Sequence, residues 1–226
     1  CMPKMPSAKM AGVTAVGLPR RRINALLNIA FYQAQAQLTD QRRTDNPDIT
    51  FPLLGLFGET GSLLSEVKKK QRDQVAYLGY EASVLEELGD VLWYLAAVSA
   101  RAGLRLDELA VNLDRGLADW HATAAPDLVF SALEAPKSGI SSAPSPAFER
   151  KLLALAGEVG LLMTDHYAGR LERNRSNLKG RLIAVLRALR DAAYEAGITL
   201  EAAAKANLEK IFDRWPTERT YPPLFD

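Results

Sequence analysis

Apolar residues recur along most of the chain at alternating spacings of three and four, the pattern of helices that bury one face. The clearest stripe lies within residues 80–102 and consists of Val84, Leu88, Val91, Leu95 and Val98. No stretch shows a convincing alternation of apolar and polar residues, and no Asn-Gly hairpin turn occurs. The pattern therefore predicts an all-α fold. Its expected helices cover about residues 22–41, 52–72, 80–102, 106–120, 147–168, 176–196 and 199–214.

The second half of the chain repeats part of the first in degenerate form. Residues 53–61 (LLGLFGETG) reappear 99 positions later as LLALAGEVG, and residues 102–106 (AGLRL) reappear 94 positions later as AGITL. Between the two copies Ala, Pro and Ser dominate, which is typical of a linker. The expected organisation is a disordered basic arm at 1–21, a first repeat at 22–122, a linker at 123–146 and a degenerate second repeat at 147–226.

The composition excludes several classes of protein. With 226 residues, of which 48% are hydrophobic and 24% charged, the chain has the balance of a globular protein. Its 28 basic and 27 acidic residues give a net charge of +1, so no nucleic-acid or membrane partner is expected. Apolar runs fall well short of the roughly 18 residues of a membrane span. Cys1 is the single cysteine, which rules out an internal disulfide and a cysteine-based zinc site, and we expect a cytoplasmic protein.

Four carboxylates of the first copy are spaced so that they can meet. Glu87 and Asp90 are three apart and therefore neighbours on one face of the expected helix, while Glu59 and Glu66 lie seven apart on the preceding helix. If two antiparallel helices bring these pairs together, the four charges repel one another unless a cation compensates them. A hard divalent cation with oxygen ligands is the natural choice, so the sequence predicts a Mg²⁺ site.

The second copy lacks two of these acids. Arg181 and Ala184 stand opposite Glu87 and Asp90, 94 positions later. Only the first copy keeps the acidic pair, which predicts one metal site per chain. On spacing alone, a solvated helix face with ion pairs to nearby lysine or arginine is the alternative.

Several segments together resemble a known family. They are GLFGETG at 55–61, EELGDVLWY at 86–94, Tyr32-Gln33 with Thr39, Lys68-Lys69, Arg72-Asp73 and Asn112 with Arg115. This set is similar to that of MazG-like nucleoside triphosphate pyrophosphohydrolases, which belong to the all-α NTP pyrophosphatase group. The resemblance covers about residues 30–120 well and the second copy weakly, apart from ANLEK at 206–210 and Arg214-Trp215.

The resemblance implies an activity and a set of ligands. Family members hydrolyse a nucleoside triphosphate to the monophosphate and pyrophosphate, with Mg²⁺ held by an ExxE…ExxD carboxylate set. For this chain we expect Mg²⁺, with Mn²⁺ as a substitute. Carried over, the metal ligands are Glu59, Glu66, Glu87 and Asp90, and Glu59 is the catalytic residue that orients the attacking water. The second Glu of ExxE is Ser62 here. In one interpretation Glu66 compensates, because helical side chains lean toward the N-terminus; a water on Ser62, or a site that binds without turnover, are the alternatives.

The resemblance also supplies candidate substrate-binding residues. Lysine and arginine neutralise the triphosphate oxygens that the metal leaves free. The expected substrate-binding residues are Gln33, Lys69, Asn112, Arg115, Lys210 and Arg214. Ordinary packing of the first helix is an equal alternative for Gln33, and a solvated helix face is the alternative for Lys69. Trp93 and Tyr94 could stack on a base, but packing in the core is favoured for both.

In the family, pairing of subunits completes the site. A fused second copy without the acidic pair therefore implies a helical bundle that is an intrachain pseudo-dimer, either monomeric or paired into a homodimer. Residues 147–226 (thirteen bases and eleven acids, net +2) would lie against residues 51–122 (seven bases and eleven acids, net −4). The expected function is Mg²⁺-dependent hydrolysis of a nucleoside triphosphate, with dUTP, another dNTP or a non-canonical NTP as the substrate. A non-catalytic nucleotide-binding regulatory protein with a degenerate site is the alternative, and a helical scaffold without a nucleotide site is a second one.

Overall fold

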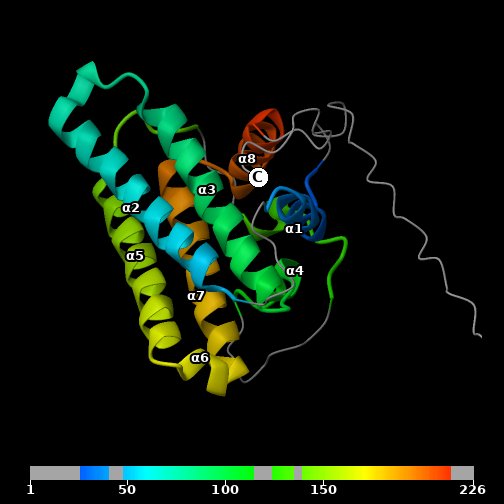
Figure 1. Ribbon diagram of the computed structural model, residues 1–226. Helices are drawn as coiled ribbons and strands as arrows, with labels where there is room; N and C mark the ends of the chain where they lie inside the picture. Colours follow the sequence, from blue (N-terminus) through cyan, green and yellow to red (C-terminus); the bar gives the residue numbers. More distant parts are fainter. Residues whose placement is uncertain (1–25, 41–47, 115–123, 135–138, 215–226) are drawn as a thin grey trace, which may run out of the picture.

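The fold is built almost entirely from helices, as the apolar pattern predicts. The computed structural model describes residues 26–40, 48–114, 124–134 and 139–214 (Figure 1). Its α-helices are α1 (Ile29–Leu38), α2 (Thr50–Asp73), α3 (Tyr80–Arg101), α4 (Leu106–Val111), α5 (Pro146–Tyr167), α6 (Arg170–Arg173), α7 (Arg175–Ala196) and α8 (Leu200–Arg214). Within these residues there are also two short 3₁₀ helices, η2 (Gln74–Ala76) and η4 (Phe130–Leu133), and an isolated β-bridge between Asn28 and Val129. The all-α prediction is confirmed for this part of the chain, and none of its helices is long and apolar enough to cross a membrane.

Four long helices, α2, α3, α5 and α7, form a bundle (Figure 1). α2 packs against α3 and α5 packs against α7, and the two pairs meet where α2 contacts α5 and α3 contacts α7. α1 and α8 cover the side of α3 that faces away from α2. The apolar stripe of α3 is buried, as its spacing predicts; it consists of Val84, Leu88, Val91, Leu95 and Val98. α3 is therefore the central helix of the fold, with helices packed on both of its sides.

α3 and α7 end in the same way. Gly103 (φ 66°) and Gly197 (φ 73°) adopt the left-handed conformation that glycine tolerates best. In each case the following residue donates its backbone N–H back to the helix, over 2.8 Å after Gly103 and 2.9 Å after Gly197. The two turns are separated by the 94 positions of the sequence repeat. This equivalence supports the tandem-repeat interpretation, which stays a prediction.

α1 begins later than the helix expected at 22–41. Residues 26–28 are not helical, and Asn28 caps α1 by accepting the backbone N–H of Phe31 at 2.9 Å. The chain around this cap pairs instead with residues 128–130 through two backbone hydrogen bonds, of 2.9 and 3.1 Å. Because these bonds reach a segment about 100 positions away, helical periodicity does not reveal them.

α4 is also shorter than expected, because it ends at Val111 rather than near residue 120. Asn112 leaves the helical conformation, with φ −98° and ψ 8°, and its Nδ2 donates to the carbonyl of Glu108 at 2.7 Å. Residues 115–123, on which the rest of the expected helix falls, lie outside the described residues. The basic arm expected at 1–21 lies outside them as well.

Part of the linker expected at 123–146 belongs to the core. Phe130 of η4 is buried and meets Tyr32 of α1 edge-on, with ring centroids 5.5 Å apart. The carboxylate of Glu134 accepts hydrogen bonds from the first two backbone N–H groups of α8. This segment therefore fixes α1 and the start of α8 beside α3, while the division into two repeats and a linker stays a prediction.

Candidate metal centre

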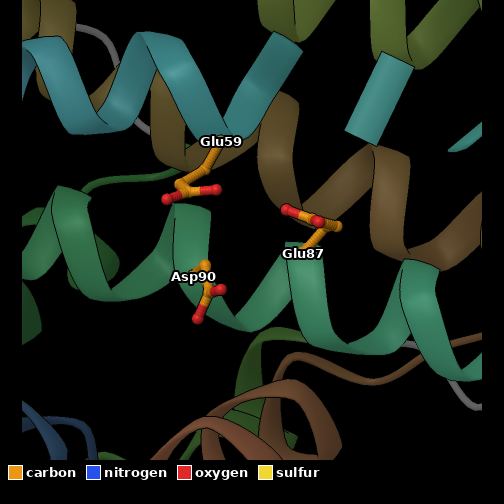
Figure 2. Close-up of side chains that lie close together, drawn as sticks. All are labelled: Glu59, Glu87 and Asp90. Atoms are coloured by element: carbon orange, nitrogen blue, oxygen red, sulfur yellow. The ribbon is translucent and has the colours of Figure 1, made fainter. Parts of the chain in front are cut away.

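Three acidic side chains meet between α2 and α3. Glu59 comes from α2, and Glu87 and Asp90 come from successive turns of α3 (Figure 2). One carboxylate oxygen of each residue lies within 4.8 Å of the other two, and all three residues are partly buried. The spacing of three on α3 and the packing of α2 against it thus bring together three of the four acids that the sequence singles out.

The cluster disfavours the ionised form of Glu87. Burial, followed by the charges of Glu59 and Asp90, raises the pKa of Glu87 to about 7. Burial and the charge of Asp90 also raise the pKa of Glu59, which shares a hydrogen bond with Glu87. Glu87 Oε2 is buried and has no hydrogen-bond partner among the described residues. Since a buried oxygen without a donor is destabilising, the cluster is incomplete without a proton or a cation.

α8 supports Asp90 from the other side. Asn207 Nδ2 donates to Asp90 Oδ1 at 2.8 Å, and the Tyr32 hydroxyl donates to Asn207 Oδ1 at 3.4 Å. Asn207 is only 2% exposed, and burial holds the pKa of Tyr32 well above its usual value, so its hydroxyl stays a donor. These two hydrogen bonds orient the Asp90 carboxylate, in the way that hydrogen bonds to a metal-binding side chain hold it in position. Sequence reasoning missed the role of Asn207, because its place beside Asp90 depends on how α8 crosses α3.

Gly89 allows that crossing. A Cβ at Gly89 would lie 2.7 Å from the carbonyl oxygen of Ala203 and 2.9 Å from the Cβ of Asn207. The backbone of α8 therefore occupies the space that a side chain at residue 89 would need. Because residue 89 is a glycine, α8 approaches α3 closely enough for the Asn207 amide to reach Asp90.

We expect Gly89→Ala to destabilise the protein by about 1–3 kcal/mol, because the added methyl group must push α8 away from α3. Gly58→Ala in α2 is the matched control: a Cβ there meets nothing within 4 Å, so this change should be neutral or stabilising by up to about 1 kcal/mol. Urea unfolding of both variants measures the difference. A midpoint for Gly89→Ala at or above that of the wild type would argue against the close crossing.

Two basic residues expected to bind the substrate lie on α8. Lys210 reaches the cluster, where its Nζ forms ion pairs with Asp90 and, at 3.0 Å, with Glu86 Oε1. Arg214 follows four positions later at the exposed end of α8, and therefore on the same side of the helix. α8 thus brings positive charge to the edge of the acidic cluster.

The structure does not bring Glu66, the fourth expected ligand, into the group of three. Glu66 is buried and accepts a hydrogen bond from the Tyr77 hydroxyl and another from Lys69 Nζ at 2.5 Å. Although burial opposes it, the hydrogen bonds from Lys69 and Tyr77 lower the pKa of Glu66. Lys69, expected to contact the substrate, is thus the counter-ion of Glu66. Tyr77 could not be foreseen as a partner, because it follows the turn after α2.

The remaining expected substrate residues have different surroundings. Gln33 is buried; its Nε2 donates to two backbone carbonyls at 3.3 and 3.1 Å, and its Oε1 accepts the N–H of Leu106 at 2.9 Å. It joins α1 to the end of α3 and the start of α4, which is the packing alternative considered for this residue. Asn112 is buried at the end of α4, and Arg115 lies outside the described residues.

Trp93 and Tyr94 pack against the core, as favoured for both. Their rings meet edge-on with centroids 4.8 Å apart, and Trp93 Nε1 donates to Thr39 Oγ1 at 3.1 Å. The Tyr94 ring lies over Gly55, where a Cβ would come within 2.0 Å of a ring carbon. The glycine of α2 therefore makes room for the aromatic side chain of α3.

The comparisons with known proteins found no relatives. No family model and no curated protein matches the sequence, and no solved structure matches the fold. The function must therefore be inferred from the residues and geometry of this chain itself.

Proposed function

We propose that the protein is a Mg²⁺-dependent nucleoside triphosphate pyrophosphohydrolase of the MazG-like kind, with Mn²⁺ as a substitute metal. The observation that carries the proposal is the meeting of Glu59, Glu87 and Asp90, whose carboxylate oxygens lie within 4.8 Å of one another. Partly buried carboxylates need a compensating charge, and Glu87 Oε2 has no donor among the described residues. A donor set made only of anionic oxygens suits a hard cation such as Mg²⁺ or Mn²⁺.

Glu59, Glu87 and Asp90 would hold the metal. When bound, the metal supplies Lewis-acid polarisation of a phosphoryl group and lowers the pKa of a bound water. Glu59 is also the candidate for orienting the water that attacks the α-phosphorus, by accepting one of its protons. Asn207 and Tyr32 keep the Asp90 carboxylate in one orientation, so that less reorganisation is needed on binding.

Lys210 and Arg214 are the candidate triphosphate-binding residues. Lys210 neutralises Asp90 in the metal-free protein, and its ammonium group becomes available to phosphate oxygens once a cation compensates Asp90. Both residues come from the second half of the chain, whereas the acids come from the first. This distribution supports a site that is completed within one chain.

Pyrophosphate release from a panel of NTPs and dNTPs, measured with Mg²⁺ and with excess EDTA, tests the proposal. We expect release from at least one nucleotide, and only with Mg²⁺. Glu59→Gln should lower the rate about 100-fold or more, because it removes both a ligand and the group that orients the water. Glu158→Gln is the matched control, since Glu158 stands 99 positions after Glu59 on α5, and it should keep the wild-type rate. Failure to release pyrophosphate from any nucleotide would contradict the enzymatic function.

The alternative of a non-catalytic nucleotide-binding regulatory protein has two observations in its favour. Ser62 stands where the family has a second carboxylate, and Lys210 already supplies Asp90 with an internal cation. Under this alternative, calorimetry with Mg²⁺ detects nucleotide binding while no pyrophosphate appears. If neither Mg²⁺ nor nucleotide changes Tm, the protein is instead a helical scaffold.

A further inference from the structure

The second half of the bundle carries charged residues at positions that match acids of the first half. Glu158 and Arg181 match Glu59 and Glu87 of the acidic cluster, 99 and 94 positions later, and Asp165 matches Glu66, which lies outside that cluster. α5 packs against α7 as α2 packs against α3. The matching side chains are therefore carried by matching helix pairs.

In the second half, arginine side chains supply the positive charge. Arg181 Nε donates to Asp165 Oδ2 at 2.6 Å, and Arg181 Nη1 lies 3.9 Å from Glu158 Oε2. Arg170 donates to the other oxygen of Asp165, also at 2.6 Å. Asp165 is 8% exposed, and the hydrogen bonds from Arg181 and Arg170 lower its pKa. Glu158 and Asp165 are thus neutralised by guanidinium groups without any bound ion.

The first half has a carboxylate where the second half has this guanidinium. Glu87 meets Glu59 across the two helices and adds to the negative charge instead of compensating it. Its Oε2 has no donor among the described residues, whereas the corresponding arginine pairs with two acids, Asp165 and Glu158. In the first half Lys210 pairs with Asp90, but among the described residues neither Glu59 nor Glu87 forms an ion pair, so the charge that Arg181 supplies in one half must come from a proton or a bound cation in the other.

We propose that the residue at this position, Glu87 in the first half and Arg181 in the second, decides which half binds a divalent cation. The guanidinium of Arg181 takes the place of the metal and makes the second half independent of it. This inference rests on the metal site of the proposed function, but not on nucleotide hydrolysis. It assigns the second half a supporting role, in which charge balance is complete before any cation binds.

The test converts the second half to the residues of the first, by combining Arg181→Glu with Ala184→Asp. Ala184 lies one turn after Arg181 on α7, is partly buried, and matches the position of Asp90. Equilibrium dialysis with Mn²⁺ counts the sites, and we expect the double variant to bind one more Mn²⁺ per chain than the wild type. In a Glu87→Gln background, which removes the first-half site, the same two substitutions should restore Mn²⁺ binding that the parent has lost.

A folded double variant that binds no more Mn²⁺ than its parent, in either background, would overturn the inference. The two backgrounds separate this result from a failure of the proposed function. If the wild type binds no Mn²⁺, the first-half site is wrong, and the inference falls with it. If the wild type binds Mn²⁺ and releases pyrophosphate but the second half gains no site, the proposed function stands and only the inference is overturned.

Arg181→Gln tests the same inference if the double variant does not fold. Glu158 and Asp165 then lose one counter-charge, so in the Glu87→Gln background we expect Mn²⁺ to raise the Tm of this variant but not that of its parent. Arg190→Gln is the matched control, because Arg190 lies on the same helix and, like Arg181, is ion-paired with two acidic residues, and it should gain no response to Mn²⁺. An Arg181→Gln variant without a Mn²⁺-dependent shift would also overturn the inference.

Discussion

Replacing Glu87 by Gln is expected to lower the rate of pyrophosphate release severely and, at the same time, to make the metal-free protein more stable at pH 8. The loss of activity follows from the removal of a charged ligand at the centre of the cluster. Because a bound metal supplies several kcal/mol of transition-state stabilisation, we expect the rate to fall on the order of 1000-fold. The gain in stability follows from the electrostatics of the same cluster without metal.

At pH 8 the folded, metal-free protein must hold Glu87 ionised beside Glu59 and Asp90. The pKa of Glu87 is raised from 4.5 to about 7, first by burial and then by these neighbours, so its ionised form is disfavoured in the folded state. Gln has nearly the same shape without the charge, and its amide can donate to Glu59. We expect a gain of about 1 kcal/mol, less than the full pKa shift implies, because the side chains are partly exposed and solvent screens their charges.

Urea unfolding at pH 8 measures this difference. With EDTA, Glu87→Gln should have the higher midpoint; with excess Mg²⁺ the order should reverse, because only the wild type binds the cation. Glu81→Gln is the control for removing an exposed acid from α3, and it should keep both the activity and the response to Mg²⁺. A Glu87→Gln variant that retains activity, or that is less stable than the wild type in EDTA, would show that Glu87 is not a metal ligand held under electrostatic strain.

The long helices could be predicted because their signals are local. α2, α3, α5, α7 and α8 each begin and end within two residues of their expected bounds. Their ends coincide with features that the sequence displays, such as Ser145 before Pro146 at the start of α5 and Gly197 after α7. The elements that could not be predicted depend on distant contacts. The burial of Phe130 and the start of α1 at Ile29 result from a pairing that joins residues about 100 positions apart.

In the candidate site, too, the parts that follow from local spacing could be predicted and those that depend on distant contacts could not. Glu87 and Asp90 share a helix face by their spacing alone, and Glu59 joins them once α2 packs against α3. Glu66 also follows the helical spacing, but its pairing with Tyr77 depends on the path of the chain after α2. The place of Asn207 beside Asp90 depends on the crossing of α3 and α8, which no local pattern specifies.

Binding of Mg²⁺ or Mn²⁺ is expected to weaken by about 50-fold when the pH falls from 7 to 5. The raised pKa of Glu87, about 7, means that over this range the cation must displace a proton from its ligand. The apparent affinity follows the deprotonated fraction, which is about one half at pH 7 and about one hundredth at pH 5. An ordinary glutamate, with a pKa of 4.5, stays mostly ionised over the same range and would change the affinity only slightly.

Protonation of Glu87 also makes the stability of the metal-free protein depend on pH. Metal affinity rises with pH, whereas this stability falls. Between the ordinary pKa of 4.5 and the raised value of about 7, the folded state binds more protons at Glu87 than the unfolded state does. The contribution of Glu87 to the free energy of unfolding is therefore complete below pH 4.5 and is lost as the pH rises through about 7. With saturating Mg²⁺ the sign reverses, because the folded state then keeps Glu87 ionised while the unfolded state takes up the proton.

Titration with Mn²⁺ at several pH values between 5 and 8 measures the first dependence, and urea unfolding in EDTA over the same range measures the second. Glu87→Gln is the control for the second measurement, since its stability should lack the decline toward pH 7 that Glu87 causes in the wild type. A dissociation constant for Mn²⁺ that is unchanged between pH 5 and 7 would mean that Glu87 is already ionised before the cation arrives. The cluster would then carry its three charges unaided, and the argument that it needs a metal to be complete would lose its electrostatic basis.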